Sequence, residues 1–116
     1  MMYELLNQRE EELFFFLFNQ EKPLTTKEMG ERLDKKHWNN VTLFRTVKSL
    51  EEKKYLTITG FERSNTQYAR RFVPAMTREE YAARLLEAKG YGPGNVAEIE
   101  KAMKQHAGSK KKTAKK

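Results

Sequence analysis

Short polar and basic side chains gather between residues 39 and 49, and their chemistry suits the edges of DNA bases. Arginine can pair with guanine through two hydrogen bonds and asparagine with adenine, while serine and threonine reach bases or phosphates. Leu43, Val47 and Leu50 recur at helical spacing, which predicts a helix that buries these three residues. The predicted DNA-contacting residues of this recognition helix are Asn39, Asn40, Thr42, Arg45, Thr46, Lys48 and Ser49. The alternative is an amphipathic helix whose polar face is only solvated.

A second group of basic residues follows in a segment with the alternation of β-strands. Residues 55–59 and 67–73 alternate in polarity on either side of turn-forming residues, which predicts a β-hairpin. Arg63 would lie near the tip of this hairpin, and Arg70 and Arg71 on its second strand. We predict that all three contact phosphates beside the recognition helix, and such contacts make binding depend on salt.

Three apolar residues near the predicted recognition helix have two interpretations each. Val41 and Phe44 lie at the border between its buried and outward faces. They either join the core or contact the methyl group of thymine, as apolar side chains do in the major groove. Trp38, just before the helix, either fills the corner between two helices, which we favour, or stacks on a base.

Capping signals predict the elements that must position these residues. Asn7, Thr25 and Thr77 are each followed three residues later by glutamate, the pattern of a capping box at a helix start. The sequence predicts five helices, which end near residues 19, 34, 54, 89 and 106, with the hairpin between the third and the fourth. Three helices closed by a two-stranded hairpin is the order of a winged helix-turn-helix.

The predicted fold class is therefore mainly α with a small β-hairpin. We assign residues 1–75 to a winged helix-turn-helix DNA-binding domain and residues 76–107 to C-terminal helices. Residues 108–116 are rich in lysine and are predicted to be a disordered tail.

The two C-terminal helices each show a narrow apolar stripe. Outside a three-helix core such a stripe needs a partner, and a second copy of the chain would supply it. A homodimer with two-fold symmetry would match a palindromic DNA site. The predicted dimer interface consists of Tyr81, Leu85, Val96, Ile99 and Met103.

The net charge of +7 is unevenly distributed along the 116 residues. Residues 110–116 hold five lysines and no acid, and residues 1–21 are acidic. Residues 25–73, which include the predicted helix and hairpin, hold 11 basic and six acidic side chains. Double-stranded DNA is therefore the predicted partner of this middle segment, whereas the lysine tail is either a solubilising end or a weak attractant for nucleic acid or membranes.

Composition also excludes several functional classes. The chain has no cysteine and only two histidines, so we expect no metal site built from thiolates or histidines. We find no nucleophile–base pair and no glycine-rich phosphate loop, so we expect neither an enzyme nor a cofactor. No apolar run approaches 18 residues and no signal peptide is recognisable, which indicates a cytoplasmic protein without membrane contact.

Several short segments occur in an order and spacing typical of one protein family. They read LNQRE at 6–10, PLTTKE at 23–28, LEEKKYL at 50–56 and TREEY at 77–81, with Trp38 and Thr42 around the start of the third helix. The chain resembles the penicillinase-repressor family of bacterial transcription regulators over residues 6–86. The resemblance implies a homodimeric repressor whose winged-helix heads bind the two half-sites of a palindromic operator. It also implies that Thr42 is the family's recognition-helix threonine.

The chain departs from that family in ways that bear on specificity and signalling. Two positions that are commonly basic in the family are Val41 and Phe44 here, so the resemblance does not carry over an operator sequence. The Asn-Phe bond cleaved in β-lactam-responsive members and the C-terminal cysteines of copper-responsive members are absent. The leading hypothesis is thus a DNA-binding transcriptional repressor with an unassigned signal. The alternative is a winged-helix protein-interaction module without sequence-specific DNA binding.

Overall fold

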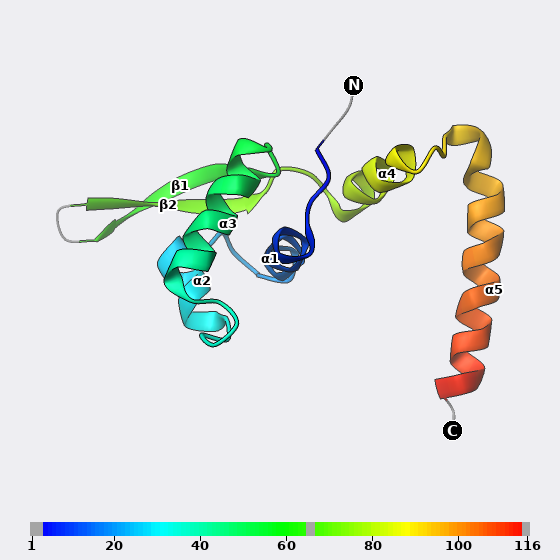
Figure 1. The fold of residues 1–116 in the computed structure, drawn as a ribbon, viewed down its shortest axis with the longest axis horizontal. Coiled ribbons are helices and arrows are strands. Elements are labelled where there is room, and N and C mark those ends of the chain that lie inside the picture. The colour runs from blue at the N-terminus through cyan, green and yellow to red at the C-terminus, as the bar shows by residue number, and fades with distance from the viewer. Residues whose placement is uncertain (1–3, 65–66, 115–116) are drawn as a thin grey trace. The chain divides into compact units, whose positions relative to one another are not determined.

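The computed structural model describes residues 4–64 and 67–114, which form two compact units that divide between Tyr81 and Ala82. The chain is mainly helical and carries one antiparallel two-stranded hairpin after the third helix (Figure 1). This arrangement confirms the coarse fold class predicted from the sequence.

Reciprocal side-chain caps fix the starts of the first two helices. α1 spans Gln8–Phe18 and α2 spans Thr26–Arg32. Asn7 and Thr25 each form a complete capping box with the glutamate three positions later, as predicted. α2 ends two residues earlier than the predicted boundary, because Leu33 already has an extended backbone.

The third helix, α3, spans Asn40–Glu52 and begins at Asn39, whose side chain accepts a backbone N–H. Two residues past its end, Lys54 adopts the left-handed conformation, with a φ of 68°. The N–H of Tyr55 then donates to the carbonyl of Leu50 at 2.8 Å, as in a Schellman motif. A lysine thus occupies a position that usually favours glycine, and it ends the helix where the hairpin begins.

The hairpin consists of β1, Leu56–Ser64, and β2, Gln67–Pro74. Its strands pair from Leu56 opposite Pro74 to Ser64 opposite Gln67, with one bulge between Ile58 and Gly60. The predicted turn over residues 60–65 is therefore wrong for residues 60–64, which extend β1. Glycine is common at strand irregularities, and the turn signal at Gly60 marks this bulge instead. The connecting residues 65 and 66 lie outside the described residues.

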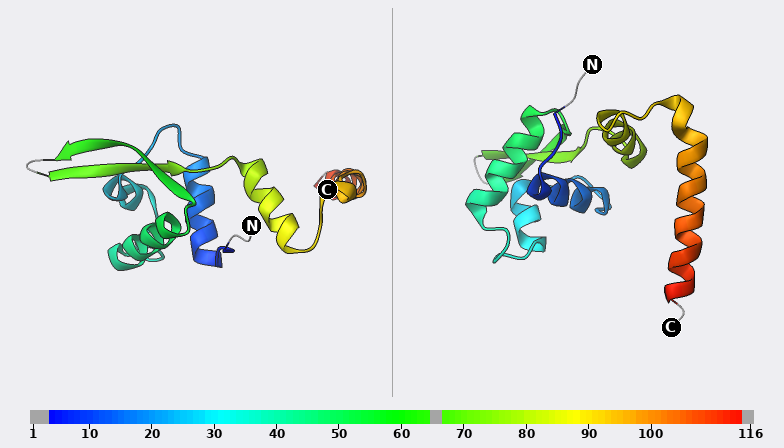
Figure 2. Two further views of the ribbon diagram at one scale, coloured as in Figure 1. Left: turned by 90° about the horizontal axis from the view of Figure 1, so that it is seen from above. Right: turned by 45° about the vertical axis from the view of Figure 1, so that its right-hand side comes forward.

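One core joins the three helices to the base of the hairpin. Phe14 packs edge-to-face on Tyr55 and on Tyr81, with ring centroids 5.4 and 5.1 Å apart. The backbone groups of Leu24, just before α2, exchange hydrogen bonds with those of Phe72 in β2. As a result α1, α2, α3 and the base of the hairpin form one packed unit (Figure 2). The other core residues are Leu13, Leu17, Met29, Trp38, Leu43, Val47, Leu50, Leu56 and Met76.

The C-terminal part of the chain begins in α4, Arg78–Ala88, whose capping box joins Thr77 and Glu80 as predicted. Two residues past the end of α4, Gly90 has a φ of 92° and occupies the position predicted for it after the helix. A short turn, η1 (Pro93–Asn95), then leads into the last helix.

This last helix, α5, spans Val96–Ala114 and corrects two predictions. It was expected to end near residue 106, with disorder from Gly108 onward. The helix instead continues to Ala114, since a single glycine costs only about 1 kcal/mol in a helix and the lysines that follow are good helix formers. Residues 115–116 of the predicted tail lie outside the described residues.

Candidate nucleic-acid interface

Four residues form a continuous stripe on the outward face of α3: Val41, Phe44, Arg45 and Lys48. Their spacing of three, four and seven residues places them on one side of a helix, and all four are exposed. We call this set the outward stripe. Asn40 is exposed beside it at the start of the helix. Three predicted contact residues, Asn40, Arg45 and Lys48, are thus exposed on the surface.

The other predicted contact residues of α3 are used by the fold instead. Thr46 is buried, and its hydroxyl donates to the carbonyl of Thr42 at 2.7 Å. The hydroxyl of Ser49 donates to the carboxylate of Glu10 in α1. The side-chain oxygen of Asn39 accepts the N–H of Thr42 at 2.9 Å and so serves as the helix cap. The prediction that Thr46 and Ser49 belong to an open face is therefore wrong, whereas Thr42 is half-buried and only its backbone groups make these contacts.

The structure decides between the two interpretations of each apolar residue near α3. Val41 and Phe44 are 59% and 60% exposed, so neither belongs to the core. Trp38 is buried, and the guanidinium of Arg9 lies 5.0 Å from its ring centroid. The expected role of Trp38 as a filler beside the helix corner is confirmed.

The three predicted hairpin arginines differ in their surroundings. Arg63 is exposed near the end of β1. Arg70 is half-exposed, forms an ion pair with Glu51 of α3 at 3.0 Å and lies over the ring of Phe72. Arg63 therefore lies exposed at the far end of the hairpin, and Arg70 joins the hairpin to α3.

Arg71 lies on the opposite face of the hairpin and ties it to α2. Its guanidinium reaches Glu28 at 3.1 Å, Glu62 at 2.6 Å and the carbonyl of Pro23 at 3.1 Å. With its charge matched by two carboxylates, Arg71 is a structural residue. This observation replaces its predicted role as a phosphate contact.

The hairpin also exposes two aromatic residues that sequence reasoning missed. Phe61 lies opposite Arg70 and Tyr68 opposite Arg63, so all four share one face of the hairpin. Phe61 and Tyr68 are 63% and 67% exposed. The alternation of apolar and basic residues in β2 carried this signal, but it was interpreted only as a sign of a strand.

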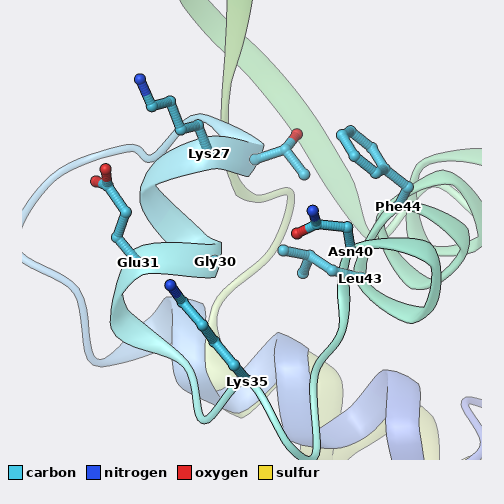
Figure 3. A pocket seen from close by; sticks show the side chains of 8 residues that line it. Lys27, Gly30, Glu31, Lys35, Asn40, Leu43 and Phe44 are labelled. Carbon is cyan, nitrogen blue, oxygen red and sulfur yellow. The ribbon is translucent and has the colours of Figure 1, made fainter.

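Two surface hollows flank Phe44. One, of about 290 Å³, lies between α2 and α3 and is bordered by Lys27, Lys35 and Asn40 (Figure 3). The other, of about 800 Å³, lies between α3 and β2 and is bordered by Lys48 and Tyr68 among others. Both hollows open between elements that carry cationic side chains. Glu31 also borders the first hollow, and Glu51 and Glu52 border the second, so the surface around Phe44 is of mixed charge with lysines from α2 and α3.

A charged cluster behind α3 fixes its position relative to α1. The carboxylate of Glu10 receives Lys53 Nζ at 2.8 Å, the hydroxyl of Ser49 and the N–H of Asn7 at 2.9 Å. Burial alone would raise the pKa of Glu10, but these hydrogen bonds and the charge of Lys53 outweigh it and hold the pKa below its usual value. Glu10 therefore stays ionised near neutral pH and fastens the back of α3.

The carboxylate of Glu28 fastens α2 as the carboxylate of Glu10 fastens α3. The N–H of Thr25 donates to Glu28 at 2.9 Å, and Arg71 lies beside the same carboxylate. The backbone hydrogen bond first, and then the charge of Arg71, keep the pKa of Glu28 below its usual value. The pair of Glu28 and Arg71 thereby ties α2 to the hairpin.

Comparisons with protein-family models, with curated proteins and with solved structures find no match for this chain. Within residues 4–64 and 67–114, no group of three or more histidines, aspartates and glutamates is placed to hold a metal ion. In the same part of the chain, no helix is both long and apolar enough to cross a membrane. The function must therefore be inferred from the geometry of the surface.

The predicted dimer interface is only partly available. Tyr81 is buried in the core of the N-terminal unit, so its assignment to a dimer interface is wrong. Leu85 and Ile99 are half-buried, while Val96 and Met103 are largely exposed. The C-terminal unit also has an apolar hollow of about 260 Å³. Its apolar border consists of Ala83, Leu86, Tyr91, Pro93, Val96 and Ile99.

Proposed function

We propose that this chain is a winged helix-turn-helix protein that binds duplex DNA sequence-specifically and regulates transcription, acting as a repressor. The observation that carries the proposal is the outward stripe of α3, which presents Arg45 and Lys48 from the same packed unit as an exposed hairpin. The proposal involves no catalytic reaction, cofactor or metal, and it places the protein in the cytoplasm.

In the proposed complex, α2 and α3 form the helix-turn-helix and α3 enters the major groove. From Val41 to Lys48 the outward stripe extends about 10 Å along the helix axis, because each of the seven steps rises by about 1.5 Å. At 3.4 Å per base pair this corresponds to about three steps of DNA. Asn40 and Arg45 suit adenine and guanine edges, and Arg63 on the hairpin suits the neighbouring backbone.

The proposal includes a homodimer formed through the C-terminal unit. Val96 and Met103 are exposed on α5, and Leu86 and Tyr91 are partly exposed beside the apolar hollow. Covering such a surface favours association with a second copy, and the resulting two-fold axis would suit a palindromic operator. Membership of the penicillinase-repressor family stays a hypothesis that agrees with this arrangement.

A second candidate function is supported by the apolar part of the same surface. Val41, Phe44, Phe61 and Tyr68 are all more than half exposed, and apolar and aromatic residues are common in protein–protein interfaces. The candidate is a winged-helix module that binds another protein and has no preference for a DNA sequence.

Selection of bound sites from a pool of random DNA duplexes separates these two functions. We expect enrichment of a two-fold symmetric consensus, because each protomer would read the same half-site. Enrichment of an unsymmetrical site would contradict the dimer, and failure to enrich any sequence would favour the protein-interaction module.

A further inference from the structure

Two of the four residues in the outward stripe are apolar, and the fold leaves both uncovered. The core side of α3 is already filled by Leu43, Val47 and Leu50, which are all nearly inaccessible. Val41 and Phe44 lie outside this buried side and are both more than half exposed. Their exposure therefore serves no packing requirement within the described part of the N-terminal unit.

The spacing of the two apolar side chains suits consecutive base pairs. Val41 and Phe44 are separated by three residues, or about 4.5 Å along the helix axis. The rise of DNA is 3.4 Å per base pair, so the two residues can meet neighbouring base pairs in the groove. Both belong to the first half of α3, the part of a recognition helix that contacts base edges.

The charged neighbours indicate what kind of partner carries the complementary groups. Arg45 follows Phe44 directly, and Lys48 lies one turn later on the same stripe. A partner that fits this stripe must offer small apolar groups close to negative charge. In the major groove of DNA the methyl group of thymine is such an apolar group, and phosphates border it on both sides.

We propose that Val41 and Phe44 read the methyl groups of neighbouring thymines, so that the recognised half-site contains thymines beside a base bound by Arg45. This inference rests on the proposed function, because it names the bases that the same helix would recognise. It also gives a role to the two positions at which this chain departs from the basic residues of the family it resembles.

The test uses uracil, which lacks only the methyl group of thymine. The duplex selected by the full-length protein is synthesised once with thymine and once with uracil at every thymine position. Affinities for both duplexes are measured by fluorescence anisotropy. We expect the wild-type protein to bind the uracil duplex about four-fold more weakly for each methyl group it contacts, the factor associated with burial of one such group.

Matched variants locate the effect on the protein. We expect F44A to lose most of its preference for the thymine duplex, and V41A to lose part of it. L5A is the control, since Leu5 is an exposed apolar residue outside α3 and its removal is expected to keep the full preference.

Each outcome bears on one proposal. Equal wild-type affinity for the two duplexes would overturn thymine recognition while leaving DNA binding intact. A preference that both F44A and V41A retain in full would overturn the assignment to these residues. Failure of the initial selection to yield any duplex would instead overturn the proposed function, and would favour a protein partner for the outward stripe.

Discussion

At the scale of single residues, Glu10 connects three parts of the N-terminal unit. It completes the cap of α1, accepts a hydrogen bond from Ser49 and pairs with Lys53 past the end of α3. Its side chain is almost fully buried, so removal of the charge would leave polar partners without compensation. The sequence indicates only the capping role of Glu10. Ser49 and Lys53 follow it by 39 and 43 positions, and local spacing cannot pair residues so far apart.

The first prediction concerns the pH dependence that Glu10 creates. Because folding lowers the pKa of Glu10 below its ordinary value of 4.5, its ionised form stabilises the native state at higher pH. This contribution is fully present above about pH 5 and is lost as the pH falls through the lowered pKa. We expect E10Q to reduce the free energy of unfolding by about 2 kcal/mol at pH 7 and to flatten the loss below pH 4.5.

Urea unfolding measures the free energy of unfolding of wild type and E10Q at several pH values between about 3 and 7. This range brackets the usual pKa values of carboxyl groups. E79Q is the control, because Glu79 is exposed in the first turn of α4 and its replacement should change stability little. An E10Q variant with wild-type stability at pH 7 would show that the cluster does not hold α3 in place.

The second prediction concerns the backbone at Lys54. A residue with a side chain pays about 1 kcal/mol to adopt the left-handed conformation that Lys54 has at a φ of 68°. We therefore expect K54G to raise the free energy of unfolding by about 1 kcal/mol. E52G, two residues earlier and still helical, should lower it by a similar amount. Thermal denaturation of K54G and E52G shows whether each variant is more or less stable than wild type. A destabilised K54G would contradict the inferred backbone strain at Lys54.

At the scale of elements, local signals predicted the starts of the helices well and the faces of α3 poorly. Asn7, Thr25 and Thr77 were found because a capping box spans only four residues. The polar flank of α3 that holds Thr46 and Ser49 was misassigned, because Thr46 is buried and Ser49 donates to Glu10 of α1, which lies far away in the sequence. Periodicity alone places the centre of a buried face but not its width.

The third prediction separates two arginines of the hairpin. We expect R63A to weaken binding to all DNA sequences and to reduce the slope of log affinity against log salt by about one unit, as for one lost phosphate contact. We expect R71A to leave that slope unchanged and to lower stability by about 1 kcal/mol, because Glu62 loses its ion pair while Glu28 keeps Lys22 as a cationic partner. Titrations at several salt concentrations, with urea unfolding of both variants, check this division. The opposite pattern would contradict the roles assigned here.

At the scale of the whole molecule, the chain divides into a unit that presents the outward stripe and a unit with an uncovered apolar surface. The order of elements was predictable because caps, apolar periodicity and strand alternation agree in each segment. The exposure of Val41 and Phe44 was not predictable, since residues at the border of a buried helix face can point either into the core or into solvent. The extension of α5 was also missed, because composition suggested disorder where the structure has a helix.

The fourth prediction tests self-association through α5. Met103 is 66% exposed, so M103K should fold normally, while a buried lysine would disfavour a dimer. We expect the dissociation constant of the dimer to rise at least about ten-fold. K101A is the control, because Lys101 lies on another side of α5 from Met103. Sedimentation velocity over a range of concentrations measures the change, and equal association of wild type and M103K would argue against this surface.

The central claim is that the outward stripe of α3 recognises a DNA sequence, and Arg45 tests it most directly. The measurement is the ratio of affinities for the selected duplex and for a scrambled duplex of equal composition, compared between wild type and R45A. We predict that R45A loses about ten-fold or more of its affinity for the selected duplex and much less for the scrambled one, so that the ratio falls. Equal losses on both duplexes, or none, would contradict sequence recognition by this helix.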